Sequence, residues 1–122
     1  MAVVRGIRGA TTATSNTKEA ILEATTELLE NLIESNEIYP DDVAAIYFTT
    51  TDDLDAEFPA QAARKMGWEY VALMGAKEVA VPGAVKKCIR VLFLVNTEKS
   101  QNEIQFTYLR GTDGLRNRGM DK

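Results

Sequence analysis

The chain contains no histidine and only one cysteine among its 122 residues. The absence of histidine excludes Ser–His and Cys–His catalytic pairs, the most common zinc ligand, and the side chain best suited to proton transfer near neutral pH. A single cysteine, Cys88, excludes an internal disulfide framework and is typical of a reducing compartment. Any catalysis by this chain must therefore rely on arginine, glutamate, lysine, tyrosine and backbone donors.

Long apolar runs are missing as well. No segment approaches the roughly 18–20 apolar residues that span a bilayer, and residues 1–5 lack the apolar stretch of a signal peptide. The net charge of −4 and the pI near 4.9 disfavour binding to nucleic acid or to an anionic membrane, because the field of the protein repels polyanions. We therefore expect a cytoplasmic protein whose anion sites, if any, are local clusters of arginine or lysine.

The hydrophobic pattern predicts an α/β (α+β) domain over residues 1–110. Apolar residues recur at helical spacing after Asn16 and Thr17, either of which can cap a helix, while alternating or β-branched runs predict strands. Glycines at 6 and 9 are expected to break the first strand. The predicted strands cover residues 3–7, 44–50, 70–73, 88–95 and 104–108, and the predicted helices cover residues 17–34 and 58–67. We expect a mixed five-stranded sheet with helices packed on one side, followed by a flexible glycine-rich tail over residues 111–122.

Arg90 is the most unexpected charge in the sequence, since it lies inside the apolar run of residues 88–95. Burying a guanidinium alone costs several kcal/mol, so this side chain needs an anionic partner. The sequence leaves two alternatives for this partner: a glutamate that lines the core, or the carboxylate of a ligand at the mouth of the sheet. Arg8 raises the same question, and the alternation of a strand places it on the face opposite Arg5.

Other polar residues carry weaker signals. Glu78 lies between apolar neighbours and fits an exposed turn, Tyr108 fits a core aromatic with its hydroxyl at the rim, and Arg64 fits the solvated face of the short helix. The acidic pairs and triplets at 41–42 and 52–55 lack the spacing of a magnesium or calcium loop, so they favour solvated turns. Cys88 is expected to be a small core residue.

Five motifs, in this order and spacing across about residues 4–109, resemble the trimeric chorismate mutases of bacteria and cyanobacteria. They are Arg5-Gly6-Ile7-Arg8-Gly9-Ala10-Thr11-Thr12, Phe58-Pro59-Ala60 with Ala62-Ala63-Arg64, Glu78-Val79 with Val81-Pro82-Gly83, Cys88-Ile89-Arg90-Val91, and Tyr108-Leu109. The resemblance implies a homotrimeric pseudo-α/β barrel with sheets inside, helices outside, and active sites in clefts between subunits. It also implies a small-molecule substrate, chorismate, which is rearranged to prephenate without cofactor or metal. The missing histidine fits such a reaction.

The resemblance also implies roles for individual residues. Arg90 would donate to the ether oxygen of chorismate, Glu78 would accept from the substrate hydroxyl, and Arg8 would hold a carboxylate. The implied substrate-binding residues are Tyr108 at the side-chain carboxylate, Phe58, Ala60 and Leu73 as apolar walls, Arg64 at the entrance, Met74 and Gly75 through their backbones, and Leu115 and Arg116 in the tail.

The chain departs from the family pattern at three places. Gly75 stands where relatives often carry cysteine or serine, Gln61 stands where they often carry a charge, and residues 111–117 replace an apolar stretch ending in Leu-Arg-Pro-Asp. We expect the altered tail to weaken substrate capture more than chemistry. Two other functions stay open: a non-catalytic trimer that binds a small carboxylate, and a trimeric hydrolase of similar fold that acts on enamines or imines.

Overall fold

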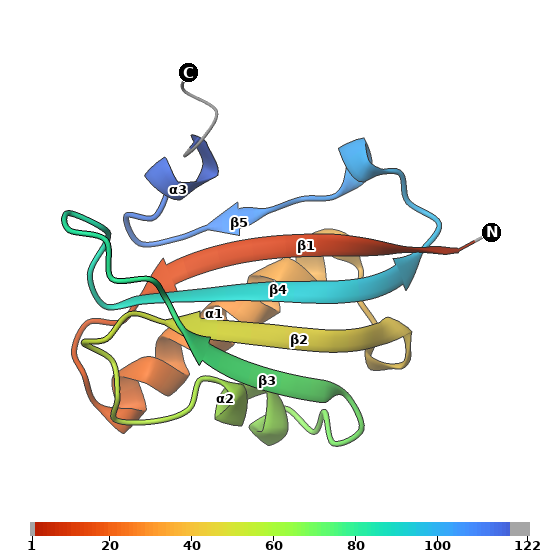
Figure 1. Cartoon of the computed structure of the whole chain (residues 1–122). Helices are drawn as coiled ribbons and strands as arrows, with labels where there is room; N and C mark the ends of the chain where they lie inside the picture. The colour runs from red at the N-terminus through yellow and green to blue at the C-terminus, as the bar shows by residue number, and fades with distance from the viewer. Residues whose placement is uncertain (1, 118–122) are drawn as a thin grey trace.

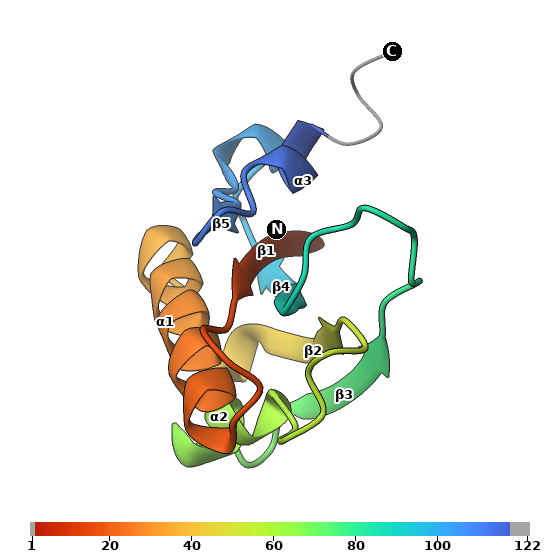
Figure 2. The ribbon, with the colours of Figure 1, turned by 90° about the vertical axis from the view of Figure 1, so that its left-hand side faces the viewer.

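A computed structural model describes residues 2–117, and its centre is one mixed sheet of five strands in the order β3-β2-β4-β1-β5. The strands are β1 (Val3–Thr12), β2 (Val43–Thr50), β3 (Ala72–Lys77), β4 (Cys88–Thr97) and β5 (Thr107–Tyr108). The helices α1 (Lys18–Asn36) and α2 (Ala60–Lys65) both lie on one side of the sheet, as Figures 1 and 2 show. The predicted mixed sheet with helices on one side is confirmed.

Strand β4 explains why only one face of the sheet is covered. Its odd-numbered residues from Ile89 to Val95 are buried in the cores against the helices, whereas Arg90, Leu92 and Leu94 point to the other side and are half-buried. Because side chains alternate along a strand, one continuous apolar run serves two environments. We call the side away from α1 and α2 the open face.

The glycines of β1 do not break the strand, which corrects the shorter strand expected over residues 3–7. Strand β1 pairs with β4 in antiparallel register from Val3 to Thr12 without interruption. A Cβ atom on Gly9 would lie 2.8 Å from Leu32 Cδ1 and 2.9 Å from the Thr107 carbonyl oxygen. Gly9 therefore permits the close approach of α1 and β5 to the middle of β1.

Helix boundaries follow the expected capping chemistry. Thr17 is the N-cap of α1, and its hydroxyl accepts from the Ala20 amide, while Asn16 instead donates to Asp55 Oδ1. Pro59 is the N-cap of α2, and Gly67, at a φ of +88°, follows that helix in the left-handed conformation that glycine tolerates. Short 3₁₀ turns, Pro40–Asp42 and Gln101–Glu103, precede β2 and β5.

Two further strands, β3 and β5, differ clearly from their predicted ranges. The third strand was expected at residues 70–73, yet Tyr70 is 98% exposed and β3 runs from Ala72 to Lys77, beside β2 in parallel register. The last strand was expected at 104–108 and contains only Thr107 and Tyr108. In both cases the strand ends where its pairing with a neighbour ends, which periodicity alone does not report.

The start of the tail packs against the domain. Thr112 is fully buried, its hydroxyl lies 3.2 Å from the Ala10 carbonyl oxygen and 2.8 Å from that of Leu109, and Leu115 packs on Ala10 and Cys88. A one-turn helix, α3 (Gly114–Asn117), follows. Residues 118–122 and the side chain of Arg116 lie outside the described part, so the mobility of the tail stays a prediction. No helix within residues 2–117 is long and apolar enough to cross a membrane.

Candidate active site

The register of the sheet sets one row of residues on the open face, from β2 across β4 and β1 to β5. Arg90 of β4 lies opposite Thr49 of β2 on one side and opposite Ala10 of β1 on the other, and Ala10 lies opposite Tyr108 of β5. Thr49 and Ala10 are small, so the long side chains of Arg90 and Tyr108 border a gap in the row. Pairing, and not proximity in sequence, places these residues together.

Four of the predicted site residues line one cavity of about 240 Å³ in this gap. They are Arg8, Glu78, Arg90 and Tyr108, joined by Gly9, Tyr47, Thr49, Val91 and Leu92. Arg8 lies two residues before Ala10 on β1, and therefore on the same face of the sheet, opposite Leu92. Two guanidinium groups, one carboxylate and one phenol thus meet on the open face, a combination suited to an anionic ligand that also carries a hydroxyl.

Arg90 forms an ion pair with Glu78, whose backbone amide donates to the Thr50 carbonyl oxygen just after β3 ends. Arg90 Nη1 lies 3.2 Å from Glu78 Oε1, and their side chains are 37% and 22% exposed. Both partners proposed for Arg90 are therefore compatible with the structure. Glu78 pairs the charge within the chain, and both side chains still line the cavity that a ligand carboxylate would occupy. A guanidinium has five N–H donors, so one contact with Glu78 does not saturate it.

Arg8 and Tyr108 are held by aromatic and apolar neighbours. The guanidinium carbon of Arg8 lies 4.9 Å from the centroid of the Phe106 ring, a cation–π contact. Tyr108 is half-buried and packs against the cluster that contains Leu115. Arg8 and Arg5 point to opposite faces as predicted, and Arg5 Nε donates to the Lys99 carbonyl oxygen at 3.0 Å, away from the cavity.

The tail reaches the site through Leu115, which lines an adjoining cavity together with Glu78 and Arg90. A polar anchor holds the tail there: Thr12 Oγ1 donates to the Arg110 carbonyl oxygen at 2.9 Å, and Arg110 Nε donates to Glu27 Oε1 at 3.0 Å. Arg110 has a left-handed φ of 50°, which turns the chain toward Thr112. The anchor places Leu115 beside the ion pair.

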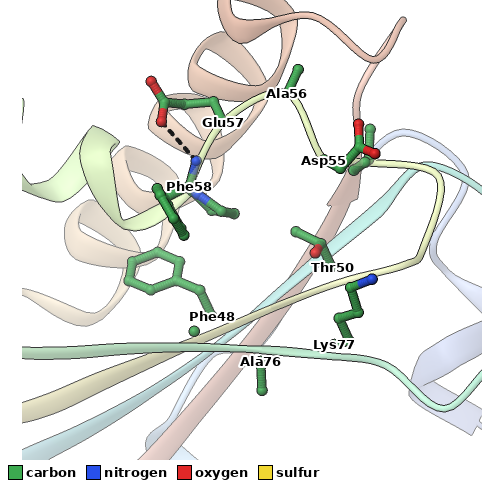
Figure 3. A pocket seen from close by; sticks show the side chains of 11 residues that line it. Phe48, Thr50, Asp55, Ala56, Glu57, Phe58, Ala76 and Lys77 are labelled. Carbon is green, nitrogen blue, oxygen red and sulfur yellow. Dashed lines mark hydrogen bonds between the residues drawn. The ribbon is translucent and has the colours of Figure 1, made fainter.

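The predicted apolar residues do not join this cavity within one copy of the chain. Phe58, which is 76% exposed, and Gly75 line a second cavity of about 460 Å³ between the loop before α2 and strands β2 and β3. Figure 3 shows the Phe58 and Phe48 side chains at this cavity, with Thr50 and Lys77 farther along the strands. The remaining predicted residues lie elsewhere: Met74 is exposed on the open face of β3, Ala60 is buried in the core, and Arg64 and Leu73 line a third cavity beside Trp68.

The loop that leads from β2 toward Phe58 is tied to the start of β4. Thr51 Oγ1 donates to Asp53 Oδ1 at 2.6 Å, and the Lys87 amide donates to both oxygens of that carboxylate. These hydrogen bonds, that of Thr51 above all, lower the pKa of Asp53 below its usual value, since they favour the charged form. The described residues contain no cluster of three or more histidine, cysteine, aspartate or glutamate side chains that could hold a metal ion.

Two features of the site escaped the sequence reasoning. Thr49 donates its hydroxyl to Glu78 Oε2, and the Thr12–Arg110 anchor holds the tail. Thr49 belongs to a predicted strand, but only the strand order reveals that it faces Arg90 and Glu78. Arg110 has no signal in the sequence at all, because its partners Glu23 and Glu27 lie on α1, more than eighty residues away.

Comparison with known proteins points to one family. The family model for chorismate mutase type I matches residues 4–118. The chain is 48% identical to the chorismate mutase AroH of Thermus thermophilus over 115 residues, which cover 93% of this chain and 94% of the relative. It is 45% identical to AroH of Bacillus subtilis strain 168 over 115 residues, covering 93% of this chain and 91% of that relative.

A solved structure gives the same result in three dimensions. A chorismate mutase from Clostridium thermocellum superimposes with a TM-score of 0.89 and 49% sequence identity, covering 91% of this chain and 99% of that one. Sequence, family model and fold agree over nearly the whole length. The chain belongs to the chorismate mutase type I family.

Proposed function

We propose that this chain is a chorismate mutase that converts chorismate to prephenate in the biosynthesis of phenylalanine and tyrosine. The reaction is a [3,3] rearrangement within one molecule, in which a C–O bond breaks as a C–C bond forms. It transfers no proton, electron or group to the protein, so it needs no nucleophile, base or cofactor. The observation that carries the proposal is the meeting of Arg8, Glu78, Arg90 and Tyr108 at one cavity.

Arg90 supplies the main electrostatic contribution. Negative charge develops on the ether oxygen as its bond to carbon lengthens, and a donor already in place stabilises that charge without reorganisation. Such a donor contributes roughly 2.7–4 kcal/mol, or about 10²–10³ in rate. The ion pair with Glu78 at 3.2 Å supports this role, because it fixes the guanidinium before substrate arrives.

Arg8, Tyr108 and Glu78 bind the ends of the substrate. The planar fork of Arg8 matches a carboxylate, the Tyr108 hydroxyl donates to the side-chain carboxylate, and Glu78 accepts from the ring hydroxyl and offsets positive charge on the allylic fragment. Holding a flexible diacid in its reactive chair removes an entropic part of the barrier.

We propose that the enzyme is a cytoplasmic homotrimer whose active sites lie between copies. The cavity around Arg90, at about 240 Å³, is smaller than the roughly 300–1,000 Å³ typical of ligand pockets, and Phe58 and Gly75 line a separate cavity. Tyr47 and Met74 are 40% and 62% exposed on the open face. This face therefore presents apolar surface that the described part of the chain does not cover. A neighbouring copy that covers this face would bring its Phe58 and Gly75 against Arg90.

The decisive experiment follows chorismate loss by absorbance with purified wild type, Arg90→Ala and Arg5→Ala. The wild type is expected to consume chorismate without added metal, and a chelator is expected to change nothing. Arg90→Ala is expected to lower kcat/KM by at least about 10²-fold. Arg5→Ala is the matched control, since Arg5 lies on the same sheet but faces away from the cavity. An inactive wild type, or near-normal turnover by Arg90→Ala, would contradict the proposal.

A further inference from the structure

Glu78 has a second partner besides Arg90. Thr49 lies directly opposite Arg90 in the pairing of β2 with β4, and its hydroxyl donates to Glu78 Oε2, while Arg90 Nη1 lies 3.2 Å from Glu78 Oε1. Each oxygen of the carboxylate is therefore held by a different strand. Thr49 also lines the cavity that contains Arg8 and Tyr108.

The two partners of Glu78 differ in what the reaction asks of them. Arg90 divides its five donors between Glu78 and, once substrate is bound, the ether oxygen, and its contact with Glu78 holds only one of the two carboxylate oxygens. Thr49 carries no charge and its backbone is fixed by strand pairing near the end of β2, so its hydrogen bond holds the other oxygen independently of Arg90. A glutamate side chain has three rotatable bonds, and holding it in one rotamer in advance avoids an entropic cost in the transition state.

From this arrangement we infer that Thr49 is a positioning residue that keeps the Glu78 carboxylate aimed at the substrate hydroxyl during the rearrangement. The inference rests on the proposed function and adds a residue to its machinery. Thr49 acts through Glu78, so its contribution belongs to the transition state and is expected in kcat more than in KM.

The test compares Thr49→Val with Thr49→Ser in a chorismate assay. Valine keeps the branched shape and strand preference of threonine but lacks the hydroxyl, whereas serine keeps the hydroxyl. Thr49→Val is expected to lower kcat about tenfold, the loss typical of a hydrogen bond to a charged group, with KM changed by less than about twofold. Thr49→Ser is expected to stay within about threefold of the wild type.

The same pair of substitutions in a Glu78→Gln background separates positioning from a general effect on structure. If Thr49 acts through Glu78, Thr49→Val in that background is expected to change kcat by less than about twofold. Wild-type kcat in Thr49→Val, or a full tenfold loss on top of Glu78→Gln, would overturn the inference.

Two controls keep these outcomes decisive. Circular-dichroism melting checks that the variants fold, and Thr49→Ala replaces Thr49→Val if valine prevents folding. The wild type and Glu78→Gln are measured in the same series. An inactive wild type would overturn the proposed function, whereas an active wild type with an impaired Glu78→Gln and an unimpaired Thr49→Val would overturn only the role of Thr49.

Discussion

The two cavities of the candidate site are built in different ways. The charged cavity is centred on Arg90 of the interior strand β4, which the β1–β4 and β2–β4 registers place between Ala10 and Thr49. The apolar cavity lies at the edge strand β3 and the loop before α2, where Phe58 is 76% exposed. Groups that stabilise developing charge need fixed positions, whereas an apolar wall needs only the right shape.

Under the proposed function, neither cavity supplies a whole site within one copy. The charged cavity has donors and an acceptor but a volume of only about 240 Å³, and neither Arg8 nor Arg90 lines the apolar cavity in the same copy. A site shared between copies resolves both deficiencies at once. Three experiments, in descending order of expected effect, test how far the two cavities depend on each other.

Mixing two inactive variants tests whether the cavities from different copies form one site. Arg90→Ala disables the charged cavity, and Gly75→Trp fills the apolar one. A Cβ on Gly75 meets nothing closer than the Phe48 carbonyl oxygen at 3.8 Å, so the chain is expected to fold with a side chain there. After denaturation and joint refolding at equal amounts, about a quarter of the clefts in random trimers combine two intact halves. We expect about a quarter of the wild-type activity.

The control for this mixing experiment is each variant refolded alone, which is expected to stay inactive. Refolding the double variant Arg90→Ala/Gly75→Trp with wild type is expected to give about a quarter of the activity as well, because each intact cleft then needs two wild-type neighbours. Absence of recovery in the first mixture, with trimers present by light scattering, would mean that one copy holds the whole site.

A substitution at the tail anchor is expected to have a smaller effect on substrate binding at the charged cavity. Arg110→Ala removes the contact with Glu27 Oε1 at 3.0 Å and loosens the turn that brings Leu115 beside Arg90 and Glu78. Because the Arg110 side chain is 27% exposed, we expect a modest rise in KM, about two- to fivefold, with kcat nearly unchanged. The charge-swapped pair Glu27→Arg/Arg110→Glu is expected to recover part of the loss. A fall in kcat without a change in KM would contradict a role in substrate capture.

The loop between β2 and Phe58, which lines the apolar cavity, has the smallest expected effect, and this effect depends on pH. The lowered pKa of Asp53 means that its carboxylate stabilises the fold at pH values above the unfolded pKa, near 3.8, and that this contribution is lost as the pH falls through the still lower folded value. Asp53→Asn is therefore expected to lower the free energy of unfolding by less than about 1 kcal/mol near pH 7, because the group is exposed.

The difference between wild type and Asp53→Asn is expected to shrink as the pH falls below about 4. Urea unfolding at several pH values measures it. Asp52→Asn is the control, since that carboxylate lies 3.8 Å from an exposed lysine, Lys77. A difference that grows at low pH would contradict the assigned hydrogen bonds.

Much of the charged cavity could be predicted from the sequence. Arg90 stood out because a guanidinium inside an apolar strand needs a partner, and the alternation of side chains separated Arg8 from Arg5. The partner of Arg90 could not be chosen from the sequence, because Glu78 reaches it only through the placement of β3 beside β2 and of β2 beside β4. The expectation that Gly9 breaks β1 was wrong for the same reason. Glycine is needed there because Leu32 and Thr107, both distant in sequence, approach too closely to leave room for a side chain.

The sequence by itself determined which helices and strands form, although not where each strand ends, and it determined the family and the kind of chemistry, because periodicity, motif order and composition can be read without knowing which segments pair. Only the tertiary structure decided that Thr49 bonds Glu78, that Arg110 anchors the tail, and that Phe58 and Gly75 lie apart from Arg90. These depend on strand order and register, which result from the burial of one face of the whole sheet and which short segments do not encode.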